Sequence, residues 1–327
     1  MVRNCVCAAF AASLAWGSCG LCAQEFDAGR PLYTIQAKGY ALTQLPTVLD
    51  QAYGSGRPVL FYVHGWGDEP RKSFDANLLG GGALPRLERE YGVRVVMFNW
   101  NSKSLGADRA DPIAHIPDSL ADFKNLLSGL ATYRRGNPEN RSPALLVHSM
   151  GSILLADSIQ SSGWAYSAEA PLFSAVLVSA PDVDSQDHAA WLEILAARER
   201  VYVTQNRQDT VLRRSTHARI LKTNFALGLE AVPPLAPSAF YIDLSDALGS
   251  KNLVFISLHA HQIFSKGWMG GNVGTCAFVS KVLRGERFDL DALEGVTRTG
   301  GNRYAMKRQV DRKNACFKDA DESAQLD

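Results

Sequence analysis

The strongest candidate for a reactive side chain is Ser149, which lies between the apolar runs Ala144–Val147 and Ile153–Leu155. An apolar strand followed at once by an apolar helix places such a serine on a tight turn, with its hydroxyl exposed. The N–H of Met150 then lies at the helix N-terminus, where partial positive charge gathers. The pattern predicts a nucleophile with an oxyanion donor beside it. The alternative interpretation is a serine that caps the helix.

A serine nucleophile needs a base to take its proton and an acceptor to orient that base. His259 and His261 follow the last strand that the sequence predicts, and Asp209 follows the strand before it by a short loop. We expect one of the two histidines to be the base and Asp209 to be the acid. Asp182, which follows an earlier strand, is the alternate acid, and its other interpretation is a side chain that fixes its own loop.

A second oxyanion donor is expected in the segment His64-Gly65-Trp66-Gly67, directly after the apolar run Val59–Val63. Glycines at the end of a strand let the backbone turn sharply and present its N–H groups. We therefore predict that the Trp66 amide shares the oxyanion with the Met150 amide. The alternative is an ordinary glycine turn.

Strands and helices alternate along the chain, as they must if these side chains are to meet. Apolar runs predict strands at Val59–Val63, Val93–Phe98, Ala144–Val147, Phe173–Val178, Arg200–Thr204 and Ala239–Ile242. Helical patterns lie at Asp118–Arg134, Ser152–Gln160 and Ser185–Arg198. Such alternation is typical of an α/β fold with a mostly parallel central sheet and helices on both faces. In that fold, functional side chains gather at the carboxyl ends of the strands.

The motifs resemble those of a bacterial branch of the α/β-hydrolase superfamily that is catalogued as a domain of unknown function. They are His64-Gly65, Phe98-Asn99-Trp100-Asn101-Ser102, His148-Ser149-Met150-Gly151, Ala180-Pro181-Asp182-Val183-Asp184, Asp209 and His261-Gln262-Ile263-Phe264. Asn101, Ala260 and Ile263 depart from the family pattern, which has proline, glycine and tyrosine there. The resemblance implies an α/β-hydrolase fold and a serine hydrolase. Phe264 matches the family pattern after the histidine, which favours His261 as the base over His259.

The expected function is that of an esterase or lipase-like enzyme that cleaves a small-molecule or lipid-like acyl ester, without a cofactor or a metal. One rival is a non-catalytic binding protein on the same fold, because fold does not determine function. Another is a metal-dependent hydrolase that uses His259 and His261 with Asp182 or Asp184. The sequence has no His-Glu-x-x-His helix and no paired cysteines at zinc spacing to favour that rival.

Composition excludes other classes. The chain has 327 residues, with 34 Lys+Arg against 33 Asp+Glu, and 46% of it is hydrophobic. This balance is globular, and a net charge of +1 gives no basic surface for nucleic acid. One basic stretch, Arg198–Lys222, would either steer an anionic substrate or form a solvated helix face. No internal apolar run reaches the roughly 20 residues that span a bilayer. The sequence does not indicate the oligomeric state.

The N-terminal residues 1–23 predict a signal peptide, with Arg3 before an apolar stretch and cleavage after Ala23. The protein is then periplasmic or secreted, with a lipid anchor or a buried helix as the less favoured alternatives. Residues 24–300 are expected to form one hydrolase domain, with 210–238 as a candidate flap and 301–327 as a charged C-terminal tail. Cys276 and Cys316 remain in the mature chain, where they either form a disulfide or stay unpaired.

Overall fold

The computed structural model describes residues 30–34, 39–67, 82–102, 110–166, 170–218, 225–248, 261–264 and 272–309. Residues 1–23, His259 and Cys316 lie outside these ranges, so the signal peptide and the second histidine stay predictions. Cys276 is buried and disulfide-bonded. Since every other cysteine of the chain lies outside the described residues, its partner does too.

Ten strands of the described chain form one sheet. They are β1 (Leu32–Thr34), β2 (Gly39–Tyr40), β3 (Val59–Val63), β4 (Arg94–Phe98), β5 (Ala144–His148), β6 (Ala175–Ser179), β7 (Val201–Gln205), β8 (Phe240–Asp243), β9 (Val296–Gly300) and β10 (Arg303–Met306). Their order is β2-β1-β4-β3-β5-β6-β7-β8-β10-β9. The strands from β4 to β10 in this order are parallel, whereas β1, β2 and β9 pair antiparallel with their neighbours. The prediction of a mostly parallel sheet is confirmed.

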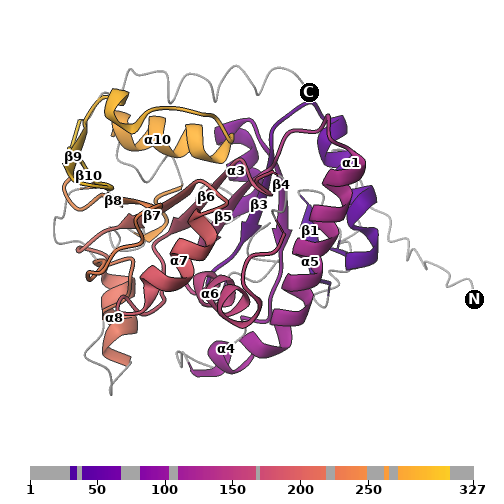
Figure 1. The fold of residues 1–327 in the computed structure, drawn as a ribbon, viewed down its shortest axis with the longest axis horizontal. Coiled ribbons are helices and arrows are strands. Elements are labelled where there is room, and N and C mark those ends of the chain that lie inside the picture. Colours follow the sequence, from indigo (N-terminus) through magenta and orange to yellow (C-terminus); the bar gives the residue numbers. More distant parts are fainter. Residues whose placement is uncertain are drawn as a thin grey trace, which may run out of the picture.

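Helices cover both faces of the sheet (Figure 1). The helices of the described chain are α1 (Leu45–Gly54), α3 (Ala83–Tyr91), α4 (Ala110–Ala114), α5 (Ile116–Gly136), α6 (Gly151–Ser162), α7 (His188–Ala196), α8 (Thr210–Ala218) and α10 (Val273–Leu283). Short 3₁₀ turns occur at Leu42–Gln44 and Leu290–Ala292. Within the described ranges, none of these helices combines the length and the apolar character that a bilayer crossing requires.

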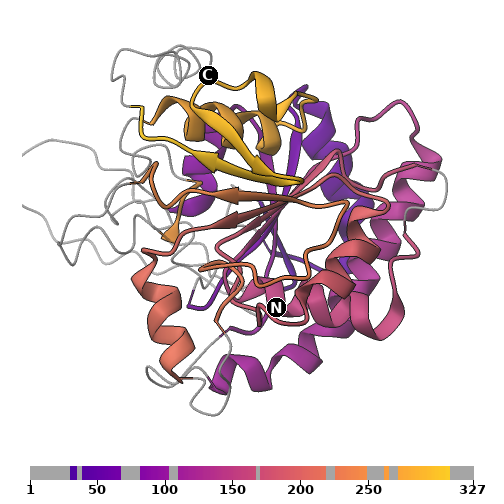
Figure 2. The same cartoon turned by 60° about the vertical axis from the view of Figure 1, so that its left-hand side comes forward.

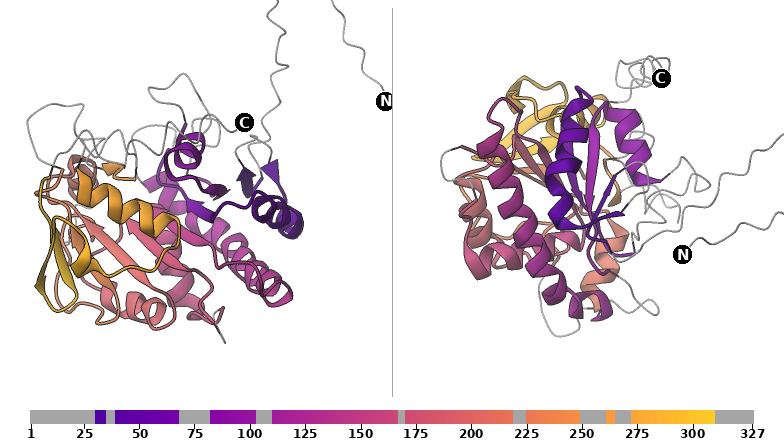
Figure 3. Two further views of the ribbon diagram at one scale, coloured as in Figure 1. Left: turned by 90° about the horizontal axis from the view of Figure 1, so that it is seen from above. Right: turned by 90° about the vertical axis from the view of Figure 1, so that its right-hand side faces the viewer.

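Strand β3 shows why the central strands are apolar throughout. Val59, Phe61 and Val63 belong to the buried cluster that includes residues of α1, α5, α6 and α7. Leu60 and Tyr62 belong to the cluster on the other face, which includes residues of α3 and α10. Successive side chains of a strand point to opposite faces, so a strand covered on both faces has no polar positions. The first elements of the chain and the β9–β10 hairpin lie at opposite ends of the molecule (Figure 3).

The order of the strands creates the site. From β3 the chain passes to β4 on one side and then returns to β5 on the other side of β3. Connections that diverge in this way leave a crevice beyond the carboxyl ends of the two strands. The segment His64–Gly67 follows β3, and Ser149 follows β5, so both lie at this switch point.

Two regions differ from the expectation. Residues 303–306, which we placed in a charged tail, form β10 beside β8, with Tyr304 and Met306 buried. Only these two buried apolar residues alternate along the strand, and Arg303 and Lys307 flank them. The apolar pattern is therefore too short to predict a strand. In the candidate flap, α8 projects away from the sheet (Figure 2), whereas Ala226 and Leu227 are fully buried. That α8 moves over the site stays a prediction.

The buried carboxylate of Glu199, just before β7, binds the segment that connects α6 to β6. Glu199, which is 3% exposed, accepts hydrogen bonds from Trp164 Nε1 at 2.9 Å, from the Leu172 N–H at 3.0 Å and from the Phe173 N–H at 2.9 Å. All three donors lie in or next to the segment that leads into β6. Since buried donors without acceptors cost the full desolvation penalty, this contact stabilises the fold.

Glu199→Ala should therefore lower the free energy of unfolding by about 3–5 kcal/mol, because it leaves these donors without an acceptor. Urea unfolding followed by circular dichroism measures this change. Glu230→Ala, at an exposed glutamate, is the control and should change the free energy by about 0.5 kcal/mol or less. Equal effects of the two variants would contradict the structural role of Glu199.

Candidate active site

Ser149 occupies a strained turn between β5 and α6. Its φ is +52°, in the left-handed region that residues other than glycine rarely adopt. The Ser149 N–H donates to the Ser179 carbonyl at 2.9 Å, and the Ser152 hydroxyl donates to the Ser149 carbonyl at 2.6 Å. These contacts hold the turn in place. Met150 follows as the N-cap of α6, where backbone N–H groups have no partner within the helix.

Two glycines allow the turn at Ser149 to approach the end of β3. A Cβ at Gly65 would lie 2.9 Å from Ser149 Cβ, and a Cβ at Gly151 would lie 2.6 Å from the His64 carbonyl oxygen. Both distances are shorter than real Cβ contacts, so neither position accepts a side chain without movement. The backbone at Trp66, one residue after Gly65, is thereby held close to the turn.

His261 joins Ser149 to Asp209. His261 Nε2 lies 3.0 Å from Ser149 Oγ, and His261 Nδ1 lies 2.7 Å from Asp209 Oδ2. A carboxylate accepts only, so Nδ1 carries the proton and Nε2 is left to accept from the serine hydroxyl. All three residues are buried, with Asp209 fully inaccessible. The structure thus brings together three residues from the ends of β5, β7 and the region after β8.

Asp209 is oriented by the helix that it precedes. Its Oδ1 accepts the N–H groups of Val211 at 2.9 Å and Leu212 at 3.0 Å, in the first turn of α8. The other oxygen, Oδ2, is left facing His261. The carboxylate therefore has a defined orientation before any substrate binds.

Asp182, the alternate acid, has a different place. Both of its carboxylate oxygens accept from the Ser215 hydroxyl on α8, at 2.8 and 2.9 Å. Its N–H donates to the Ser149 carbonyl at 3.2 Å and to Ser152 Oγ at 3.1 Å. Asp182 thus connects α8 to the turn at Ser149. Sequence patterns did not indicate the contributions of Ser152 and Ser215, because an isolated serine carries no signal of its partner.

Two further histidines, His148 and His64, lie beside the site. The His148 ring lies 4.8 Å from the His261 ring and 4.9 Å from the Phe264 ring, between centroids. His64 stacks on Trp100, with centroids 5.7 Å apart, and its carbonyl accepts from the Trp100 indole at 2.7 Å. Burial lowers the pKa of His148 well below 6.5, and repulsion from His261 lowers it further. His148 is therefore neutral beside His261 at physiological pH.

The lowered pKa of His148 predicts that folding stability falls in mild acid. The unfolded chain binds a proton on this residue below pH 6.5 and the folded chain does not. One such group lowers the free energy of unfolding by about 1.4 kcal/mol as pH falls from about 7.5 to about 5.5. The same amount is regained as pH rises. Urea unfolding across this pH range measures the loss in the free energy of unfolding. We expect this loss to be smaller in His148→Gln than in the wild type. Ser149→Ala, which keeps His148, is the control, and equal losses in all three proteins would contradict the prediction.

Within the described ranges, no group of three or more His, Cys, Asp and Glu side chains is arranged to hold a metal ion. The metal alternative depended on His259, which lies outside those ranges. Of the two acids that could complete that metal site, Asp182 accepts from Ser215 as described above, and Asp184 accepts the Gln186 N–H at 3.1 Å.

The family model described as "Alpha/beta hydrolase of unknown function (DUF900)" matches residues 44–228, more than half of the chain. Among solved structures, an esterase of Pyrobaculum calidifontis is similar at 13% identity, over 69% of this chain and 76% of that one, with a TM-score of 0.33. No curated protein matches the chain.

Proposed function

The chain belongs to the alpha/beta hydrolase family of unknown function (DUF900), and from this premise we propose that it is a serine hydrolase that cleaves a carboxylic ester. The expectation of an α/β-hydrolase fold and family is thereby confirmed. One observation carries the proposal: Ser149 Oγ, His261 and Asp209 form a continuous hydrogen-bonded series at 3.0 and 2.7 Å. This geometry suits a nucleophile, a base and an acid that orients the base.

In the proposed mechanism, His261 Nε2 takes the proton of Ser149 as the serine oxygen attacks the acyl carbonyl. Asp209 keeps the imidazole in the required tautomer and stabilises its charged form. The tetrahedral intermediate collapses as His261 returns the proton to the leaving alcohol, which yields an acyl-enzyme. A water molecule then gives its proton to His261 and attacks the acyl group, and the acid leaves as Ser149 regains its proton.

The oxyanion in this mechanism is bound by the amides of Trp66 and Met150. Trp66 lies in the segment after β3, and Met150 is the N-cap of α6, so both amides lie at the switch point. Preorganised N–H donors of this kind stabilise the charge that develops during attack. We propose a small-molecule or lipid-like acyl ester as the substrate and no cofactor. Export to the periplasm or beyond, by the segment 1–23, completes the proposal.

A fluorophosphonate probe tests the proposal, because it reacts with an activated serine and not with an ordinary one. We expect one label per chain, on the peptide that contains Ser149, together with turnover of short p-nitrophenyl esters. Heat-denatured protein is the control and should take no label. Absence of both label and turnover would favour a binding protein, and turnover that a chelator abolishes, without label, would favour the metal-dependent alternative.

Gly65→Ala tests the proposed role of the Trp66 amide, in the loop after β3, as an oxyanion donor. The new Cβ would lie 2.9 Å from Ser149 Cβ, so the loop must move away from the serine and take the Trp66 amide with it. Since loss of one oxyanion donor costs about 10²–10³-fold in kcat, we expect a decrease of about 10²-fold or more. Gly54→Ala is the matched control, because a Cβ there meets nothing within 4 Å. Unchanged kcat in Gly65→Ala would remove Trp66 from the mechanism.

A further inference from the structure

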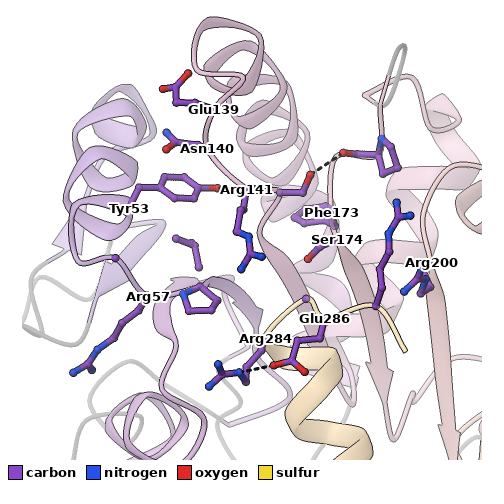
Figure 4. Close-up of a pocket in the computed structure, with 17 residues that line it drawn as sticks. Tyr53, Arg57, Glu139, Asn140, Arg141, Phe173, Ser174, Arg200, Arg284 and Glu286 are labelled. Atoms are coloured by element: carbon purple, nitrogen blue, oxygen red, sulfur yellow. Dashed lines mark hydrogen bonds and ion pairs between the residues drawn. The ribbon is translucent and has the colours of Figure 1, made fainter. Parts of the chain in front are cut away.

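A cavity lies at the opposite end of the sheet from Ser149. It encloses about 800 Å³ and is formed by the segments that precede β3, β5, β6 and β7 and the one that follows α10 (Figure 4). Ser142 lines it, seven residues before Ser149 on the same strand segment. At about 3.3 Å per residue this separates the two sites by about 20 Å. We call it the arginine cavity, after the five arginines in its lining: Arg57, Arg141, Arg200, Arg284 and Arg287.

Glycines with positive φ build two of its walls. Gly56, with φ +70°, makes the turn after α1 that leads to Arg57. Gly285 has φ +65°, and a Cβ there would lie 2.1 Å from Ser174 Oγ. Only glycine fits such a contact, so the segment 284–287 lies directly against the start of β6. The positions of the arginines on this wall are therefore determined by close packing of the backbone.

One of the five arginines is neutralised within the protein. Arg284 Nε lies 2.8 Å from Glu286 Oε1, and Arg284 Nη1 donates to the Tyr91 carbonyl at 3.3 Å. Glu286 also pairs with Lys281 at 3.3 Å. The cavity's own carboxylate at Glu286 is thus already shared between two cations.

The other four arginines have no ion-pair partner of this kind among the described residues. Across the described ranges, no salt bridge involves Arg57, Arg141, Arg200 or Arg287. The Arg200 side chain forms a hydrogen bond with Tyr202, whereas its Nη1 atom is buried and has no hydrogen-bond partner among the described residues. Glu139 is the second acid in the lining and lies at an exposed position. For a chain of net charge +1, this is a marked local excess of positive charge.

Like charges gathered around one cavity repel each other unless an anion lies between them. Guanidinium groups bind phosphate oxygens through paired N–H donors, which a compact ammonium cannot do. The volume is that of a small-molecule site and much larger than one phosphate needs. We propose that the arginine cavity binds a small anion that carries two or more phosphate groups. This site is independent of the proposed ester hydrolysis.

Calorimetric titration with sodium pyrophosphate, at constant ionic strength, tests the proposal in the whole protein. We expect saturable binding that is at least tenfold weaker for the double variant Arg141→Gln/Arg287→Gln, whose two sites are exposed so that the fold is kept. The control is Arg214→Gln/Arg308→Gln, which removes the same charge from exposed positions outside the cavity and should bind within twofold of the wild type.

Two outcomes would overturn the inference. One is equal affinity in the two double variants, which would place the anion elsewhere. The other is no binding beyond that of sodium chloride at the same ionic strength. Orthophosphate should bind at least tenfold more weakly than pyrophosphate, and equal affinities would contradict the requirement for two phosphate groups. Ser149→Ala should bind pyrophosphate like the wild type, so failure of the hydrolase proposal would leave this result unaffected.

Discussion

Ser149→Ala is expected to lower kcat/KM for an acyl ester by about 10⁴-fold or more. The substitution removes the atom that attacks the carbonyl and the partner of His261 Nε2. The backbone of the turn keeps its contacts to Ser179 and Ser152, which involve only main-chain atoms of residue 149. The free energy of unfolding should therefore change by only about 1 kcal/mol.

Steady-state kinetics on a panel of short acyl esters, with urea unfolding of the same samples, measures both quantities. Ser161→Ala is the matched control, since this serine lies at an exposed position near the end of α6 and donates to the Asp157 carbonyl of its own helix. It should retain full activity. Activity in Ser149→Ala near the wild-type level would exclude Ser149 as the nucleophile.

Asp209→Asn is expected to lower kcat by about 10⁴-fold while the fold is retained. The amide keeps an oxygen for the N–H groups of Val211 and Leu212, so its NH₂ group must face His261 Nδ1. A donor in that position forces the imidazole into the tautomer with the proton on Nε2, which cannot accept the serine proton.

Asp182→Asn distinguishes the two candidate acids. The asparagine still accepts from the Ser215 hydroxyl, so α8 stays connected to the turn at Ser149 and kcat should fall by about tenfold or less. Stopped-flow or steady-state assays of both variants across pH measure the difference. A larger loss in Asp182→Asn than in Asp209→Asn would reverse the assignment of the acid.

Much of the fold follows from local sequence. The run Val59–Val63 is strand β3 with the predicted bounds, because a strand covered on both faces must be apolar at every position. The turn at Ser149 was likewise predicted, since an apolar strand and an apolar helix leave little room between them. The hairpin of β9 and β10 was not predicted. Strand β9 is the edge of the sheet, where charged residues are allowed on the exposed side, and β10 beside it has only two buried apolar residues, Tyr304 and Met306.

From the chain alone, the candidate partners of the serine could be ranked, with Asp209 preferred to Asp182 as the acid, but their contacts could not be derived. Both carboxylates follow a strand. Only the structure shows that one carboxylate binds Ser215 and the other His261. The order of β6, β7 and β8 in the sheet decides this difference, and strand order depends on contacts between distant segments.

The arginine cavity is a second feature that depends on contacts between distant segments and could not be predicted from the sequence. Its five arginines come from four separate segments, with no spacing that would group them. By sequence, Arg200 belongs to the basic stretch Arg198–Lys222, which also contains Asp209. In the structure, β7 separates Arg200 from Asp209 at its two ends. A residue's own neighbours along the chain determine whether it forms a strand or a helix. Which strand ends adjoin, and therefore which charges meet, is decided by the packing of the whole sheet.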